Sequence, residues 1–102
     1  HYKDVFGYLE GAAAEFDDVK LVLLKYRSAI DASKKFRLAA DFFRQSTKYE
    51  NRVFNNDSFH VLDKKENQID CYLEEDYMII LIYPPAYDID DVHAALENAL
   101  KN

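Results

Sequence analysis

The sequence has very little of what cross-links, breaks or turns a chain: one cysteine, two glycines and two prolines in 102 residues. A lone cysteine, Cys71, excludes an intramolecular disulfide and a cysteine-built zinc cluster, and it favours a reducing compartment, for which we expect the cytoplasm. The two glycines, Gly7 and Gly11, exclude a glycine-rich phosphate loop. Apolar runs are also short, because the longest ends at Pro84, so we expect no membrane association.

What is present is enough apolar material for one folded domain. Hydrophobic residues make up 49% of the chain and aromatic residues 15%, which excludes disorder as its main character. No internal repeat and no Ser/Gly-rich linker divides the sequence. We therefore expect a single domain over residues 1–102.

The first half carries helical spacing. Val5, Leu9, Ala12 and Phe16 lie four, three and four residues apart, which predicts a first helix. A longer heptad-like seam follows at Val22, Tyr26, Ala29, Ser33, Phe36, Ala40 and Phe43. The stretch from Val19 to Leu24 is apolar nearly all round, and we favour a helix there over a strand. Between Asp18 and Thr47 the pattern leaves one long helix or two open, because Ser28 to Asp31 resembles a capping box.

After Glu50 the pattern changes to short β-rich runs. They cover Arg52 to Phe54, Phe59 to Leu62, Ile69 to Leu73 and Tyr77 to Tyr83. The last run does not alternate, which predicts a central strand that is covered on both faces. A final helix, capped by Asp88 or Asp90, has apolar positions at Ile89, Val92, Leu96, Ala99 and Leu100. The predicted fold class is α+β, with N-terminal helices, an antiparallel β-meander of three to four strands and a C-terminal helix.

The net charge of −6 is unevenly distributed along the chain. Residues 20–52 hold nine of the thirteen basic residues and only three acids. A basic face of the predicted central helix is formed by Arg27, Lys34, Arg37, Arg44 and Lys48. A solvated helix face is the favoured interpretation, and a contact for phosphate or for an acidic partner is the alternative. Nucleic-acid binding through this face is disfavoured by the negative total.

Acidic residues and tyrosines gather in the last third of the sequence. One acidic group, Glu74, Glu75 and Asp76, lies at a predicted hairpin turn, and an ordinary charged turn is its favoured interpretation. Another, with Asp88 and Asp91, lies at a predicted helix start, where capping and the helix dipole explain it without any function. With Tyr72, Tyr77 and Tyr87 they predict an acidic, tyrosine-rich surface that suits a basic protein partner.

Two residue groups invite a catalytic interpretation. His93 shares a predicted helix face with Asp90 and Glu97, and His60 lies on a strand next to that of Cys71. Surface salt bridges explain the first group better, and a buried cysteine explains the second. We therefore expect no catalytic residue, no metal and no cofactor.

The leading hypothesis is a non-enzymatic protein-binding domain, such as a small acidic inhibitor, antitoxin or immunity-type protein that covers a basic site on its target. The alternative is a homo-oligomerising regulatory or interaction domain, such as a homodimer, in which the heptad-like seam or an exposed strand face pairs with a second copy. Nucleic-acid binding through the basic helix face ranks third.

Overall fold

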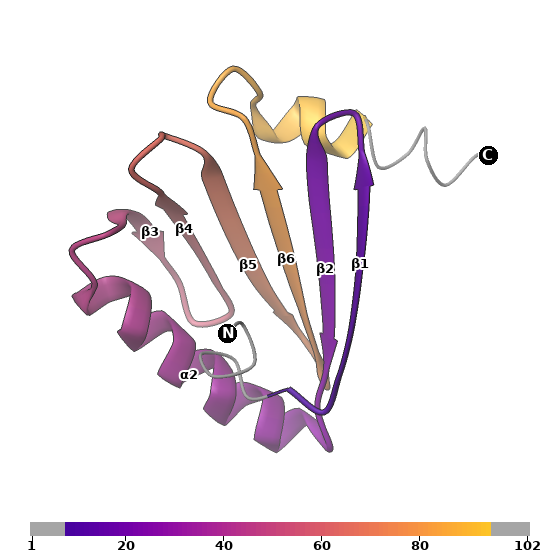
Figure 1. Cartoon of the computed structure of the whole chain (residues 1–102). Coiled ribbons are helices and arrows are strands. Elements are labelled where there is room, and N and C mark those ends of the chain that lie inside the picture. The colour runs from indigo at the N-terminus through magenta and orange to yellow at the C-terminus, as the bar shows by residue number, and fades with distance from the viewer. Residues whose placement is uncertain (1–7, 95–102) are drawn as a thin grey trace.

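Six antiparallel strands form one sheet in the computed structural model, which describes residues 8–94 (Figure 1). The elements are β1 (Glu10–Phe16), β2 (Val19–Lys25), α2 (Ala29–Gln45), β3 (Glu50–Phe54), β4 (Ser58–Leu62), β5 (Gln68–Glu74) and β6 (Tyr77–Tyr83), followed by a short helix over 89–94. Their order across the sheet is β1-β2-β6-β5-β4-β3. The predicted fold class, with helices first and a meander of three to four strands, is therefore wrong, because the protein is mostly sheet.

The described part of the predicted first helix is wrong, because it forms β1, the first strand of a β-hairpin. β1 pairs with β2 so that Phe16 lies opposite Val19, which leaves a turn of two residues. Both turn residues, Asp17 (φ 49°) and Asp18 (φ 64°), have the left-handed conformation of a type I′ turn. Aspartate tolerates this conformation through its short polar side chain, so the hairpin needs no glycine. The helical spacing failed here because pairing with β2 overrides the helix propensity of the alanines.

The stretch from Val19 to Lys25, for which we favoured a helix, is also a strand. Its side chains alternate between the two faces of the sheet, with Val22 and Leu24 in one apolar cluster and Val19 and Leu21 in another. A strand that has apolar contacts on both faces carries apolar residues at successive positions. This explains the continuous run that we interpreted as a buried helix.

Only one helix lies between Asp18 and Thr47, and it begins at Ala29. Ser28 is its N-cap, and the Ser28 hydroxyl accepts a hydrogen bond from the Asp31 backbone N–H at 3.1 Å. The residues resembling a capping box therefore start the helix and do not divide it. The inward residues of the seam, Phe36, Ala40 and Phe43, are buried against the sheet. This part of the seam therefore packs inside the domain and is not accessible to a second copy.

The four β-rich runs predicted after Glu50 correspond to β3, β4, β5 and β6, which pair consecutively. β6 also pairs with β2, so the first hairpin joins the other four strands through it. The prediction that Tyr77 to Tyr83 is a central strand is confirmed, since β6 is the third of the six strands across the sheet and lies between β2 and β5.

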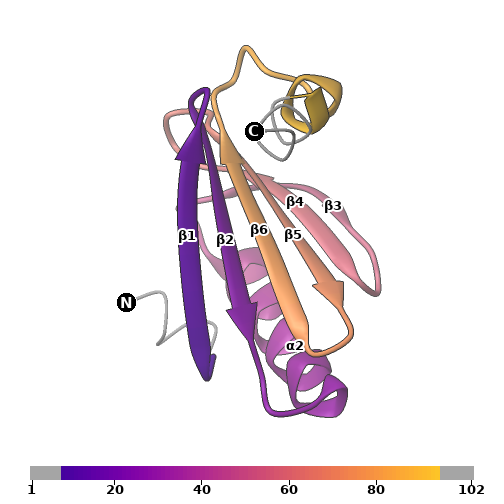
Figure 2. The same cartoon turned by 90° about the vertical axis from the view of Figure 1, so that its right-hand side faces the viewer.

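The sheet has a different cover on each face. α2 packs diagonally on one face (Figure 1). The ring centroids of Phe36 on α2 and Phe59 on β4 are 5.6 Å apart there. On the other face the helix over 89–94 covers only one end, and Val92 packs there with Val19, Leu81 and Tyr83 (Figure 2). Burial of each such side chain stabilises the fold by about 2 kcal/mol. The sheet face under α2 is called the helix face below, and the opposite one the open face.

The helix over 89–94 begins where the sequence predicts. The Asp91 N–H donates to Asp88 Oδ1 at 2.9 Å, and the Asp88 N–H donates to Asp91 Oδ2 at 3.0 Å. This reciprocal cap assigns the role to Asp88 and not to Asp90. The remaining apolar positions predicted for this helix, Leu96, Ala99 and Leu100, lie outside the described residues. Within the described chain, no helix is long and apolar enough to cross a membrane.

Candidate functional site

Apolar and aromatic side chains remain accessible on the open face, away from the helix over 89–94. Leu23 of β2 lies opposite Ile79 of β6, and Tyr72 of β5 lies opposite Ile79 from the other side. Leu23 is 38% exposed, while Tyr72, Tyr77 and Ile79 are half-buried. These four residues are called the open-face patch. The helix over 89–94 lies at the other end of this face (Figure 2), although Tyr72 also packs against the apolar cluster that includes Val92.

Acidic residues lie at the same end of the sheet as the open-face patch. Glu74 pairs with Tyr77 across the β5–β6 hairpin, whose turn consists of Glu75 (φ 52°) and Asp76. Glu74 and Glu75 are exposed, and Asp76 is half-buried. One cation lies among them, since Lys25 Nζ is 5.8 Å from the ring centroid of Tyr77.

The predicted partner-binding residues therefore fall into two groups. Five of them surround the patch: Tyr72, Glu74, Glu75, Asp76 and Tyr77. Tyr87, Asp88 and Asp91 lie beyond the opposite end of β6. There the Tyr87 hydroxyl donates to the Asp17 carbonyl at 2.8 Å, while Asp88 and Asp91 cap a helix. The second group has structural contacts, and the structure does not join it to the first.

The predicted basic face lies on and next to α2. Arg27, Lys34, Arg37, Arg44 and Lys48 are all exposed. Arg44 forms a surface ion pair with Asp41 at 3.5 Å and lies 4.5 Å above the Phe54 ring, so its charge is partly engaged. Apolar residues interrupt this face, with Ile30 71% and Leu38 60% exposed. The basic residues thus form a mixed surface and no continuous cationic stripe.

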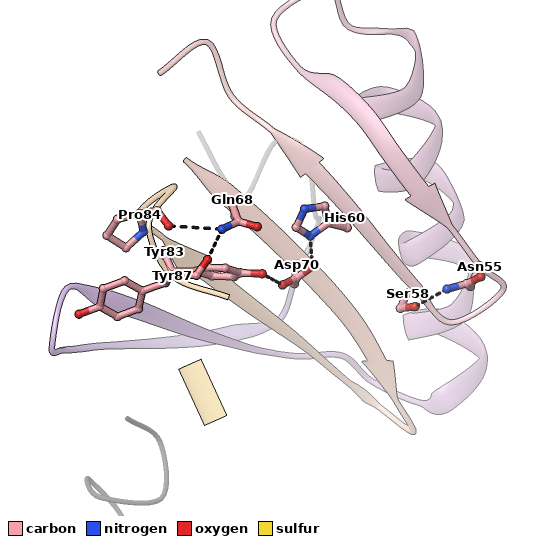
Figure 3. Close-up of polar contacts among 8 residues, drawn as sticks. All are labelled: Asn55, Ser58, His60, Gln68, Asp70, Tyr83, Pro84 and Tyr87. Carbon is pink, nitrogen blue, oxygen red and sulfur yellow. Dashed lines mark hydrogen bonds and ion pairs between the residues drawn. The ribbon is translucent and has the colours of Figure 1, made fainter. Parts of the chain in front are cut away.

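A buried carboxylate that the sequence analysis did not single out lies in the middle of the open face. Asp70 of β5 is 6% exposed, and both of its oxygens are engaged (Figure 3). His60 Nδ1 lies 2.5 Å from Asp70 Oδ1, and the Tyr83 hydroxyl donates to Asp70 Oδ2. The three residues come from three adjacent strands. His60 of β4 lies opposite Asp70 of β5, and Tyr83 belongs to β6, on the other side of β5.

Gln68, two residues before Asp70 on β5, holds the segment that follows β6 against the sheet. Gln68 lies opposite Tyr83, and its Nε2 donates to the Tyr87 carbonyl at 2.5 Å and to the Pro84 carbonyl at 3.3 Å (Figure 3). Burial, followed by the hydrogen bond to Asp70, raises the pKa of Tyr83 well above its usual range. Tyr83 is therefore a neutral donor at any physiological pH, and the network stays satisfied.

A histidine held by a carboxylate can serve as a general base, since the carboxylate fixes the proton on Nδ1 and leaves Nε2 as an acceptor. His60 borders a shallow recess of about 320 Å³ that is also lined by Arg52, Leu62, Glu66, Gln68 and Pro85. None of these lining residues is a serine, threonine or cysteine. The geometry thus supplies an oriented imidazole without an adjacent protein nucleophile.

The other residues considered for catalysis are not brought together. Cys71 is fully buried on the helix face, next to Met78, whereas His60 lies on the open face. Burial raises the pKa of the Cys71 thiol well above its ordinary value, which leaves it unreactive. His93 is exposed on the helix over 89–94, and Glu97 lies outside the described residues. Within the described chain, no group of three or more His, Cys, Asp or Glu residues is arranged to hold a metal ion.

Comparison of the chain with models of protein families, with curated proteins and with solved structures found no match.

Proposed function

We propose that this chain is a non-enzymatic protein-binding domain that holds a basic partner against its open-face patch. The observation that carries the proposal is the unequal cover of the sheet. α2 buries one face, whereas the open-face patch keeps Leu23, Ile79 and two tyrosines accessible within the described structure. Contiguous accessible apolar surface is typical of interaction sites, and tyrosine is enriched in them.

The charges around the patch support a basic partner. Glu74 and Glu75 are exposed at the hairpin end of the patch, and Glu10 of β1 is exposed at the same end. Acids at the rim of an interface steer a cationic partner into encounter, while buried aromatic and aliphatic side chains carry most of the affinity. A small inhibitor, antitoxin or immunity-type protein that occludes a basic site would use this division of roles.

The alternative of self-association through the heptad-like seam loses its support, because Phe36, Ala40 and Phe43 are buried inside the domain. An enzyme that uses His60 as a general base is the second candidate, and the Asp70 contact at 2.5 Å favours it. It would need a substrate that carries its own nucleophile or a water that His60 activates. Binding of a basic protein needs no such addition.

The test compares partner capture by variants of opposite surfaces. The patch variant is Leu23→Ser with Tyr77→Ser. The control is Leu38→Ser on α2, an apolar residue that is more exposed than Leu23, at 60% against 38%. Immobilised protein is exposed to extract of the native source at low salt, and retained proteins are quantified by mass spectrometry. We expect a basic protein whose affinity falls roughly tenfold or more with the patch variant and stays unchanged with the control.

Charge reversal separates steering from holding. With the captured partner purified, Glu74→Lys with Glu75→Lys should slow association and weaken its salt dependence, with a smaller effect on dissociation. Loss of capture in Leu38→Ser with full capture by the patch variant would transfer the interface to α2 and refute the proposal.

A further inference from the structure

The two edges of the sheet differ in how they are protected against pairing. β3, at one edge, has five residues, and its register with β4 shifts at a bulge between Asn51 and Val53. It also carries an ion pair between Glu50 and Arg52 at 3.3 Å. Short length, a bulge and charged side chains are the devices that stop an edge strand from pairing with another chain.

β1, at the other edge, is longer, has no bulge and carries charged side chains only near its two ends, at Glu10 and Glu15. Its seven residues, EGAAAEF, pair with β2 in unbroken register and include no proline or lysine. Gly11, Ala12, Ala13 and Ala14 are all exposed, and such small side chains leave the backbone open to a second strand. No other described strand pairs with the outer side of β1 (Figure 1). Its outward N–H and C=O groups therefore form a regular row without a described partner strand.

An apolar recess accompanies this edge on the helix face. It measures about 510 Å³, and its lining includes Tyr8, Gly11, Ala13, Val22 and Leu24. α2 lies across the lower part of the sheet and leaves this margin uncovered within the described structure (Figure 1). A strand added to β1 would lie along one side of the recess and reduce its exposure to water.

We infer that β1 pairs with β1 of a second copy of this chain, antiparallel, about a two-fold axis perpendicular to the sheet. In such a pair the two copies keep the same face upward, so a residue can oppose only residues an even number of positions away. With the axis at Ala13, Ala13 opposes its own copy, Ala12 opposes Ala14 and Gly11 opposes Glu15. This juxtaposition makes the two six-stranded sheets one continuous sheet with both α2 helices on one side.

The charges of β1 permit a second copy as the occupant. With the axis at Ala13, Glu10 opposes Phe16 and Glu15 opposes Gly11, so no two carboxylates lie directly opposite each other, an arrangement that would destabilise neighbouring strands. Glu15 is moreover paired with Lys20 of β2 at 3.4 Å within its own protomer. The symmetric arrangement also places the two apolar recesses side by side across the axis.

Cysteine substitution along β1 tests both the contact and its register. Paired Cα atoms across an antiparallel ladder are about 4.5 or 5.5 Å apart, which lies within the range for a disulfide. Cys71 is fully buried, so an introduced thiol is the only accessible one. Under mild oxidation, Ala13→Cys should form a covalent dimer, whereas Ala12→Cys and Ala14→Cys react more slowly. Val53→Cys on the protected β3 edge, which is 51% exposed, is the matched control.

Sedimentation of the unmodified protein completes the test. We expect a monomer–dimer equilibrium that proline in β1 abolishes, using Ala12→Pro and Ala13→Pro in parallel. Successive residues point their N–H groups to opposite sides of the strand, so one of the two prolines removes only an outward N–H. That variant keeps the hydrogen bonds between β1 and β2, and its unfolding transition should match that of the parent protein. A protein that stays monomeric over the full concentration range, with Ala13→Cys no faster than Val53→Cys, would overturn the inference. The open-face variants should leave the dimer intact, so this test and that of the proposed function fail independently.

Discussion

Asp70 shows how a single residue joins three strands. Its carboxylate accepts a hydrogen bond from Tyr83 of β6 and contacts His60 of β4, while its own backbone lies in β5. A buried carboxylate costs free energy unless its oxygens are engaged, and here both are. Removing it would strand a buried tyrosine hydroxyl and leave a half-buried imidazole without its partner.

We predict that Asp70→Ala lowers the free energy of unfolding by about 3 kcal/mol, because it breaks a buried network from its centre. Urea denaturation followed by circular dichroism measures the loss. Asp41→Ala is the matched control, since it removes a carboxylate from a surface ion pair with Arg44 and should cost less than about 0.5 kcal/mol. Equal losses in the two variants would show that the network adds nothing to stability.

Residue patterns alone could not have found this network. Asp70 follows an apolar residue and precedes Cys71 and Tyr72, so the sequence indicates that β5 alternates. Which strand lies on either side of β5, and in which register, depends on pairings that only the assembled sheet defines. The acidic turn and its tyrosines were foreseen because they lie within one hairpin. Tyr87 and Asp88 were grouped with them by proximity in sequence and lie at the other end of β6.

At the scale of elements, sequence reasoning succeeded where structure is local. The four strands after Glu50 alternate or are bounded by turn residues, and the helix over 89–94 has its aspartate cap, so both were predicted near their observed positions. The prediction for β1 failed because alanine favours a helix, and only pairing with the neighbouring strand makes this segment extended. β2 failed because apolar residues on both faces of a strand resemble a buried helix.

The start of α2 gives a local prediction. Ser28 has extended backbone angles (φ −157°, ψ 166°), and its hydroxyl satisfies the Asp31 N–H. Ser28→Ala should cost about 1 kcal/mol of unfolding free energy, whereas Ser28→Asp should be close to neutral, because aspartate caps as well. Thermal and urea unfolding measure both variants. A Ser28→Ala protein as stable as the parent would mean that α2 is held by its packing alone.

At the scale of the whole molecule, buried ionisable groups on both faces of the sheet make the folded state less stable at alkaline pH. Burial raises the pKa of Cys71 and Tyr26 under α2, and that of Tyr83 on the open face. Their ordinary values are 9.0 for the thiol and 10.0 for the phenols. The unfolded chain therefore releases protons that the folded chain retains, and stability must fall as pH rises above these ordinary values.

Urea midpoints measured from neutral pH upward should stay level to about pH 9 and then decline. Tyr26→Phe removes one of the groups that must ionise, so its decline should be shallower than that of the parent protein. A control substitution of an exposed residue that does not ionise, Leu38→Ser, should leave the slope unchanged. A flat profile to pH 11 would contradict the link between these buried groups and folding.

The place of β6 in the sheet has a consequence for the order in which the chain assembles during synthesis. β6 is the last of the six described strands to be made, yet it lies between β2 and β5. Until the ribosome has released Tyr77–Tyr83, the β1–β2 hairpin and the β3–β4–β5 ladder are separate pieces with no strand to connect them. Contacts between segments distant in sequence form slowly, and unfinished sheets expose their edges to other chains. A nascent chain of this protein thus completes its sheet in one late step, and a product truncated before β6 would leave both pieces with open edges.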